Sequence, residues 1–373
     1  MSAAARVRAQ GLCDPRARDV HGAVRAALAI QAQDTRASRL GVRARSEGLT
    51  AADVVRACSA ERSVVRTWAM RGTLHVLPAE DVRWITGLTG PVVIARTARR
   101  RADLGLDAGL CERIVAAVPA VLGGGPLTRA EVVAALGDRG VAVPREGQAP
   151  AHVVLLACAS GVACRGPDRP DEEPTYVLLD DWVAPEPARD RDDSLAELAR
   201  RFRGAYGPSD ARDLARWSGL PVGDAVRGWR RAGFAGDDGG GAAGGTGGGG
   251  GAGGAEGAGG AGGGAGGGAG EVGPVRLLPA FDGLLLGHRD RTPLVAPADA
   301  PALVRGTWIL PSVLVGDRIA GTWTRARRRG EEVVTVTPFH DLAPATTAAL
   351  AADVADLGRF LGVPATLELA GSP

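Results

Sequence analysis

The sequence contains no lysine, so all 44 of its basic residues are arginine. This absence excludes a covalent intermediate on a lysine amine. It also weakens any argument from the number of arginines, because genomic base composition can replace lysine throughout a protein. The distribution of the arginines is therefore more informative than their count.

Cysteine and histidine are scarce. The five cysteines are scattered, and their odd number and spacing argue against a disulfide framework and against a zinc site. The five histidines are widely spaced, and we find no phosphate-binding loop, paired-carboxylate motif or His/Asp cluster. These absences give little support to a nuclease that depends on a metal ion or a nucleotide.

Long apolar stretches are missing too. No run of about 18 apolar residues could span a bilayer, and the N-terminus lacks an apolar segment followed by a cleavage site. We therefore expect a cytoplasmic protein that does not enter a membrane.

The charge is unevenly distributed. The net charge is only +2, yet residues 1–103 hold 18 arginines against 9 acidic residues. A basic N-terminal part fits contact with a polyanion such as nucleic acid. An ordinary solvated basic face explains the same counts, so charge alone does not decide.

Glycine is concentrated in one tract. Residues 239–270 contain only Gly and Ala apart from Thr246 and Glu256. Such a composition buries too little apolar surface to offset the entropy of ordering, which predicts a flexible insert.

Helices followed by strands recur along the rest of the chain. The pattern predicts a first module over 1–105, a second over 106–190, a third over 191–300 that the insert interrupts, and a C-terminal unit over 301–373. Three helices followed by a β-hairpin is the winged-helix plan. The fold class that we predict is therefore α+β, with tandem winged-helix modules, a C-terminal β-meander and a closing helix.

The predicted elements can be given by residue range. Helices are expected at 17–33, 36–48, 51–60, 110–123, 125–140, 147–161, 193–207, 207–219, 220–233 and 344–361. Thr50 and Ser209 are expected as N-caps. Strands are expected within 63–78, at 161–166, at 175–183, from 274 and in a three-stranded meander over 308–339.

Four stretches resemble a known family. They are "IQAQD" (30–34), "RSVVRTWAMRGTLHVLPAEDVRWI" (62–85), "LLPAFDGLLLGHRDR" (277–291) and "VGDRIAGTWTR" (315–325). In this order they resemble the AlkZ/YcaQ-like DNA glycosylases of the winged-helix superfamily called HTH-42. The resemblance implies a concave DNA-binding surface, and a catalytic Gln-Φ-Gln motif at Gln31 and Gln33. Gln33 favours the AlkZ-like branch, because the YcaQ branch carries Asp there.

The resemblance also implies a function. We expect a monofunctional DNA glycosylase that removes bulky cationic alkylpurines from double-stranded DNA, unhooks interstrand crosslinks and protects its host from a genotoxic natural product. It should act as a monomer at the nucleoid, without any cofactor. The alternative is a non-enzymatic DNA-binding regulator or lesion-binding protein, which would bind without releasing a base.

The motif makes chemical sense. Alkylation at guanine N7 or adenine N3 makes the base a cationic leaving group, so modest groups can suffice. An amide does not titrate near neutrality, but it can hold a water molecule in fixed geometry. Amides at i and i+2 share a side only in an extended segment. The first helix must therefore end near Gln31, with Asp34 or Thr35 capping the next.

Other residues are candidates with open alternatives. His75 could line the site or be an ordinary buried histidine, and Arg71 could line the site. Arg66 or Arg71 could bind phosphate or pair with Glu80 or Asp81. Asp282, with Arg289 and Arg291 close behind it, could belong to a DNA contact or to a salt-bridged structural cluster, and we favour the structural role. The "RARRRG" run (325–330) could reach DNA or be a solvated turn. The arginines expected to contact DNA are Arg36, Arg43, Arg45, Arg66, Arg325, Arg327 and Arg328.

Overall fold

The computed structural model describes residues 2–187, 189–234 and 273–371. The Gly/Ala-rich insert expected at 239–270 lies outside the described residues. None of the described helices has both the length and the apolar character needed to cross a bilayer.

The N-terminal part surrounds a small sheet with helices. Its elements are α1 (Ala3–Ala9), α2 (Val20–Ala26), β1 (Ile30–Gln31), α3 (Thr35–Ala44), α4 (Ala51–Cys58), β2 (Val64–Trp68), the 3-10 turn η1 (Met70–Gly72), β3 (Leu74–Pro78), the 3-10 turn η2 (Ala79–Asp81) and α5 (Val82–Asp103). Thr50 caps α4 as predicted, in a capping box with Asp53. The alternating segment 63–78 is an antiparallel hairpin of β2 and β3. The first predicted helix is shorter than expected, since α2 ends at Ala26.

The second part repeats this plan. Its elements are α6 (Ala108–Leu122), β4 (Leu127–Thr128), α7 (Arg129–Gly137), α8 (Ala149–Ala159), β5 (Ala163–Arg165), β6 (Thr175–Leu178) and α9 (Leu179–Trp182). The predicted helices and hairpin are present, with two corrections. The helix expected at 125–140 begins only at Arg129, after the strand β4, and the strand expected at 175–183 ends at Leu178, where α9 begins.

The two parts share one topology. Each runs through a helix, a short strand, two helices and a hairpin, and the short strand pairs with the second hairpin strand. The resulting strand orders are β1-β3-β2 and β4-β6-β5. The predicted repetition is thus present, and β1, which carries Gln31, occupies the position that β4 has in the second part.

The third part consists of α10 (Arg191–Tyr206), α11 (Ala211–Ser218) and α12 (Val222–Arg231). The prediction that Ser209 caps α11 is wrong. Asp210 is the N-cap, because its carboxylate accepts from the backbone N–H of Asp213 in a reciprocal capping box. The hairpin expected after α12 falls in the insert and lies outside the described residues.

The C-terminal part is built on a five-stranded sheet. Its elements are β7 (Val275–Leu278), α13 (Gly283–Leu286), α14 (Ala300–Leu303), β8 (Val304–Arg305), β9 (Trp308–Ile309), β10 (Ser312–Val315), β11 (Arg318–Arg328), β12 (Glu331–Pro338), α15 (Pro344–Leu361) and β13 (Ala365–Leu369). The order β13-β12-β11-β10-β7 contains the predicted meander. Since β7 pairs with β10, this unit begins at β7 and not at residue 301.

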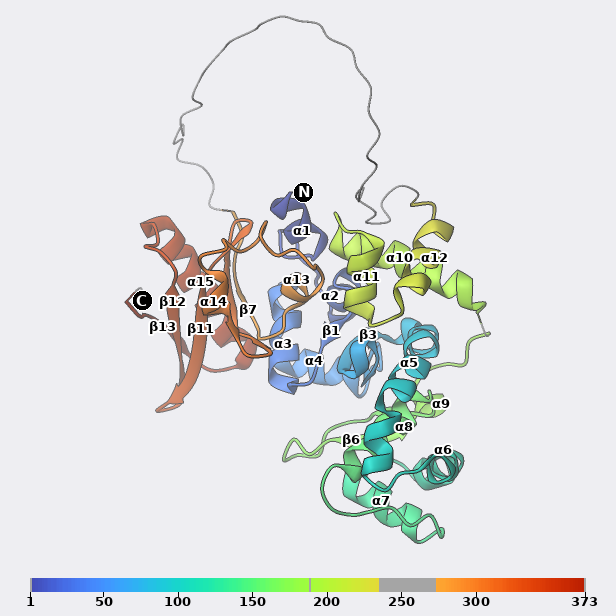
Figure 1. Ribbon diagram of the computed structural model, residues 1–373. Coiled ribbons are helices and arrows are strands. Elements are labelled where there is room, and N and C mark those ends of the chain that lie inside the picture. Colours follow the sequence, from blue (N-terminus) through green and yellow to red (C-terminus); the bar gives the residue numbers. More distant parts are fainter. Residues whose placement is uncertain (1, 188, 235–272, 372–373) are drawn as a thin grey trace, which may run out of the picture.

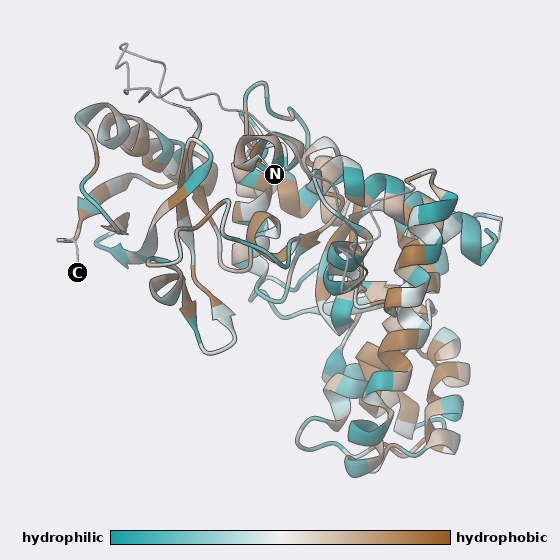
Figure 2. Ribbon diagram, turned by 45° about the horizontal axis from the view of Figure 1, so that its top comes forward, coloured by the Kyte–Doolittle hydropathy of each residue, from teal (hydrophilic) through white to brown (hydrophobic). Residues whose placement is uncertain are grey.

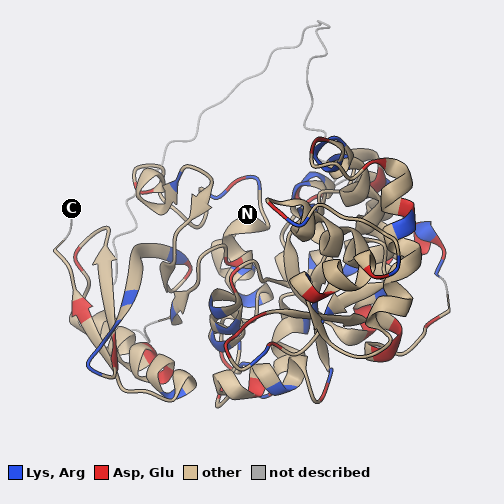
Figure 3. Cartoon of the chain, turned by 90° about the horizontal axis from the view of Figure 1, so that it is seen from below, with Lys and Arg blue, Asp and Glu red and all other residues tan. Residues whose placement is uncertain are grey.

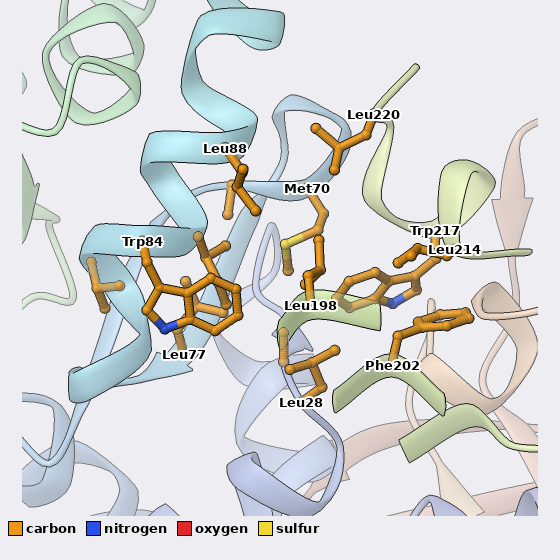
Figure 4. Close-up of a cluster of buried hydrophobic side chains, with 14 of the residues drawn as sticks. Leu28, Met70, Leu77, Trp84, Leu88, Leu198, Phe202, Leu214, Trp217 and Leu220 are labelled. Atoms are coloured by element: carbon orange, nitrogen blue, oxygen red, sulfur yellow. The ribbon is translucent and has the colours of Figure 1, made fainter. Parts of the chain in front are cut away.

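The N-terminal part lies at the centre of the molecule. Figure 1 shows the C-terminal sheet on one side of α2–α4, helices α10–α12 on the other, and α6–α8 at the lower end. One core packs the β2–β3 hairpin and α5 against α10 and α11, through Met70, Trp84, Phe202 and Trp217 (Figure 4). A second core packs α2–α4 on the C-terminal sheet. A third lies within the second part, where Figure 2 shows apolar residues concentrated in α6–α8.

The sequence pattern does not predict the 22-residue helix α5, because its middle reads Thr-Gly-Leu-Thr-Gly-Pro, with Pro91 inside the helix. Packing explains Gly90. A Cβ atom there would lie 2.0 Å from the carbonyl oxygen of Ala159 in α8, whereas Gly87 in the same helix has no atom within 4 Å of such a position. The close approach of α5 and α8 therefore requires glycine at residue 90 only.

This pair of glycines gives a matched test of the packing. Gly90→Ala should lower the free energy of unfolding by about 1–3 kcal/mol, because the added methyl group forces α5 and α8 apart. Gly87→Ala should raise it by about 0.5–1 kcal/mol, because alanine loses less backbone entropy in a helix. Urea unfolding of the two variants checks both values. Equal effects of the two substitutions would contradict the α5–α8 contact.

Candidate active site

The two glutamines of the motif lie on the extended segment between α2 and α3. Leu28 adopts a positive φ of 65° after the end of α2 and turns the chain into β1. In β1, Gln31 pairs with His75 of β3, and the next backbone N–H, that of Ala32, donates to Leu74 at 2.7 Å. Asp34 then caps α3 by accepting from the N–H groups of Arg36 and Ala37. The motif is extended, as its spacing predicts.

Gln31 is oriented by Arg71. The guanidinium Nη2 of Arg71 donates to Gln31 Oε1 at 2.8 Å, and its Nη1 donates to the carbonyl of Trp217 in α11. The backbone of Arg71 is left-handed, with φ 58°, and Gly219 leaves room for it, because a Cβ there would lie 3.0 Å from Arg71 Cα. Burial lowers the pKa of Arg71 from its ordinary value, although arginine stays charged at neutral pH.

Gln33 is exposed and its side chain turns back to the hairpin. The backbone N–H of Leu74 donates to Gln33 Oε1 at 3.2 Å. In both glutamines the oxygen therefore faces a protein donor, which directs the NH2 group away from that donor. Among the described residues, no carboxylate forms a hydrogen bond with either amide.

His75 is neutral at physiological pH. It is 2% exposed, and its Nδ1 lies 3.0 Å from the carbonyl of Thr73, so that nitrogen carries the hydrogen. Burial, assisted by the charge of Arg71, lowers the pKa of His75 from 6.5 to about 3. His75 is thus both a buried histidine and the residue directly opposite Gln31.

The low pKa of His75 predicts a pH-dependent stability. The unfolded chain binds a proton at His75 below about pH 6.5 and the folded chain only below about pH 3, so stability falls as the pH drops through this window. Between pH 7.5 and 5 the loss should be about 2 kcal/mol from this residue. Urea unfolding at both pH values should show a smaller loss in His75→Gln. Equal losses in the parent and in His75→Gln would contradict this assignment.

Two of the arginines expected to contact DNA are interior residues. Arg43 pairs with Asp353 at 2.7 Å and with Asp356 at 2.8 Å, and Arg45 pairs with Asp282 at 2.8 Å. Both arginines are 1% exposed. A guanidinium buried this deeply cannot reach a phosphate outside the protein, so the prediction of DNA contact is wrong for both. Asp282 is in an ion pair as expected, but its partner is Arg45.

Arg66 is also held inside the structure. It is 8% exposed and pairs with Asp168 at 2.7 Å. Asp168 belongs to the loop between β5 and β6, so this ion pair joins the first part to the second. The sequence offered Glu80 and Asp81 as partners of Arg66. In the structure Glu80 pairs with His21 and Arg25, and Asp81 pairs with Arg201. Arg66 is therefore no longer a candidate for DNA contact.

The remaining arginines of the predicted set lie on the surface. Arg36, Arg325 and Arg327 line a cleft of about 430 Å³ between α3 and the C-terminal sheet. Arg328 follows on the β11–β12 hairpin, whose tip carries the basic residues drawn blue at the left of Figure 3. Arg36 pairs with Glu172 at 2.9 Å and Arg325 with Glu332 at 3.3 Å, both within reach of solvent.

Sequence reasoning missed the contribution of α11 to the site. The carbonyl of Trp217 and the close approach of Gly219 fix Arg71, and both come from a segment more than a hundred residues away. Among the described residues, no group of three or more His, Cys, Asp or Glu side chains could hold a metal ion. The polar site is thus made of amides, one neutral imidazole and arginine.

These features define a mixed α/β protein with a repeated helix-and-hairpin plan and a site built from non-titrating amides. The chain belongs to the AlkZ-like DNA glycosylase family, whose model matches residues 24–360. A relative from Streptomyces sahachiroi named "Interstrand DNA cross-link repair glycosylase" is 28% identical over 360 residues, covering 94% of this chain and 92% of the relative. The solved structure of Streptomyces sahachiroi DNA glycosylase AlkZ has a similar fold, with a TM-score of 0.71 at 22% identity, and the match covers 99% of this chain and 98% of that one.

Proposed function

We propose that the protein is a monofunctional DNA glycosylase that hydrolyses the N-glycosidic bond of bulky, cationic alkylpurines in double-stranded DNA. The observation that carries the proposal is the pair of amides, Gln31 and Gln33, each oriented by a protein donor on one extended segment. The neutral His75 beside them adds no second charge to the site. A site without a general acid suits a base that alkylation has already made cationic, because such a base can leave without being protonated.

The reaction needs little from the protein beyond positioning. The cationic base departs with the electron pair of the glycosidic bond and becomes neutral, so it needs no proton. Water adds to C1′ of the sugar and its proton passes to solvent, leaving an abasic site and the free alkylated base. Gln31 and Gln33 would hold the water and the sugar in reacting geometry. Bringing reactants into this geometry is a large part of the activation free energy in such reactions, so positioning alone can accelerate them.

The wider assignment follows from the same proposal. The name of the Streptomyces sahachiroi relative supports interstrand crosslinks as a further substrate class, and we extend the proposal to protection of the host against a DNA-alkylating natural product. The enzyme would act on the nucleoid as a monomer. Arg36, Arg325, Arg327 and Arg328 are the DNA contacts that we propose on the surface, because they are accessible and basic.

The direct test uses duplex DNA that carries a single N7-alkylguanine. The purified protein, incubated with a metal chelator and no nucleotide, should release the alkylated base and leave a site that alkali cleaves. Mass spectrometry of the released base and gel analysis of the strand report the two products. Tight binding without release of any adduct, small or bulky, would contradict the proposal and leave a lesion-binding protein or a regulator.

A further inference from the structure

Arg71 is a partly buried cation without a counter-charge. Its two hydrogen bonds go to an amide oxygen and to a backbone carbonyl, which are both uncharged. Within the described part of the chain, no carboxylate forms an ion pair with it. Arg43, Arg45 and Arg66, by contrast, each have a carboxylate oxygen at 2.7 or 2.8 Å. Removing part of a guanidinium from water without supplying an anion costs free energy, so an anion from outside would be stabilised at Arg71.

Two exposed arginines flank Arg71 from the neighbouring helices. Arg216 in α11 directly precedes Trp217, whose carbonyl accepts from Arg71. Arg96 lies one turn after Val93 in α5, and a Cβ atom on Gly72 of η1 would lie 3.4 Å from a methyl carbon of Val93. Both charges act to lower the pKa of Arg71, as expected for close neighbours. In the described residues neither Arg96 nor Arg216 has an ion-pair partner.

We propose that Arg71, Arg96 and Arg216 form a binding site for the phosphodiester backbone of DNA beside Gln31. Arg71 in η1 binds Gln31 and a carbonyl of α11, and Arg96 and Arg216 are exposed on α5 and α11, the two helices that pack against η1. The planar fork of arginine matches phosphate oxygens. Because Arg71 also donates to Gln31, a phosphate bound here would fix the amide relative to the sugar on which it acts. This inference rests on the proposed function, which makes DNA the ligand. It adds DNA contacts to those proposed at Arg36, Arg325, Arg327 and Arg328.

The test is the salt dependence of binding to a short undamaged duplex. Each phosphate contact contributes about 0.9 to the slope of log K against log salt. Arg96→Gln and Arg216→Gln should each reduce the magnitude of the slope by about 1, whereas Arg96→Lys and Arg216→Lys should largely keep it. Both residues are exposed, so the variants are expected to fold, and thermal unfolding checks this. The control is Arg113→Gln, because Arg113 in α6 is exposed and has no ion pair in the described residues.

The outcomes separate this inference from the proposed function. Slopes that stay at the parental value in Arg96→Gln and Arg216→Gln, or that fall equally in Arg113→Gln, overturn the phosphate site even if the protein releases adducted bases. Reduced slopes in the two variants alone support the site even if no base release is found, because undamaged DNA is the probe.

Discussion

Alanine at Gln31 or at Gln33 is expected to slow the release of N7-alkylguanine by about 10²–10³-fold under single-turnover conditions, which is the usual cost of removing one preorganised polar contact to a reacting group. DNA affinity should stay near the parental value, since neither amide carries charge. The double variant should lose little more than either single variant, because groups that hold the same water act as a unit.

The matched control for this experiment is Gln148→Ala. Gln148 is the exposed N-cap residue of α8 in the second part, and its Oε1 accepts from Arg100 of α5 at 2.9 Å. Its variant should release the base at the parental rate. Parental rates in Gln31→Ala and Gln33→Ala, with base release still occurring, would move the chemistry to other residues and leave the glycosylase assignment standing.

The sequence predicts the local geometry of the site well. Two amides at i and i+2 require an extended backbone, and Asp34 can cap the helix that follows; both features are present. What could not be predicted is the donor to Gln31. Arg71 reaches it through a left-handed backbone that is uncommon for a residue other than glycine, and it is held by a carbonyl of α11.

The roles of the arginines show the same limit. Arg36 and Arg43 lie on α3 and Arg45 is its C-cap. All three have the same chemistry, yet one is exposed and two are buried. Their burial is decided by acidic partners 310 and 237 residues away in the sequence. Helix periodicity assigns a face to each residue, but it does not reveal which distant carboxylate covers that face. A lysine-free sequence makes this harder, because one residue type serves both DNA contacts and interior ion pairs.

Breaking the buried pair of Arg45 and Asp282 should destabilise the protein more than breaking an exposed ion pair. Asp282→Ala is expected to lower the free energy of unfolding by about 3–5 kcal/mol, because it leaves a 1% exposed guanidinium without its anion. Arg56→Ala is the control: Arg56 pairs with Asp53 and Glu61 but is 53% exposed, so solvent screens these pairs and the loss of stability should be far smaller. Urea unfolding measures both.

The double variant Arg45→Met/Asp282→Leu distinguishes an interior ion pair from a DNA contact. Replacing both charges by apolar side chains of similar volume should restore most of the stability, apart from about 1 kcal/mol for the lost cap of α13, where Asp282 accepts from Leu284 at 2.9 Å. Because Arg45 cannot reach DNA from its buried position, this variant should keep the parental affinity and salt slope. A stable double variant that binds DNA with a slope reduced by about 1 would show that Arg45 leaves the interior to contact a phosphate.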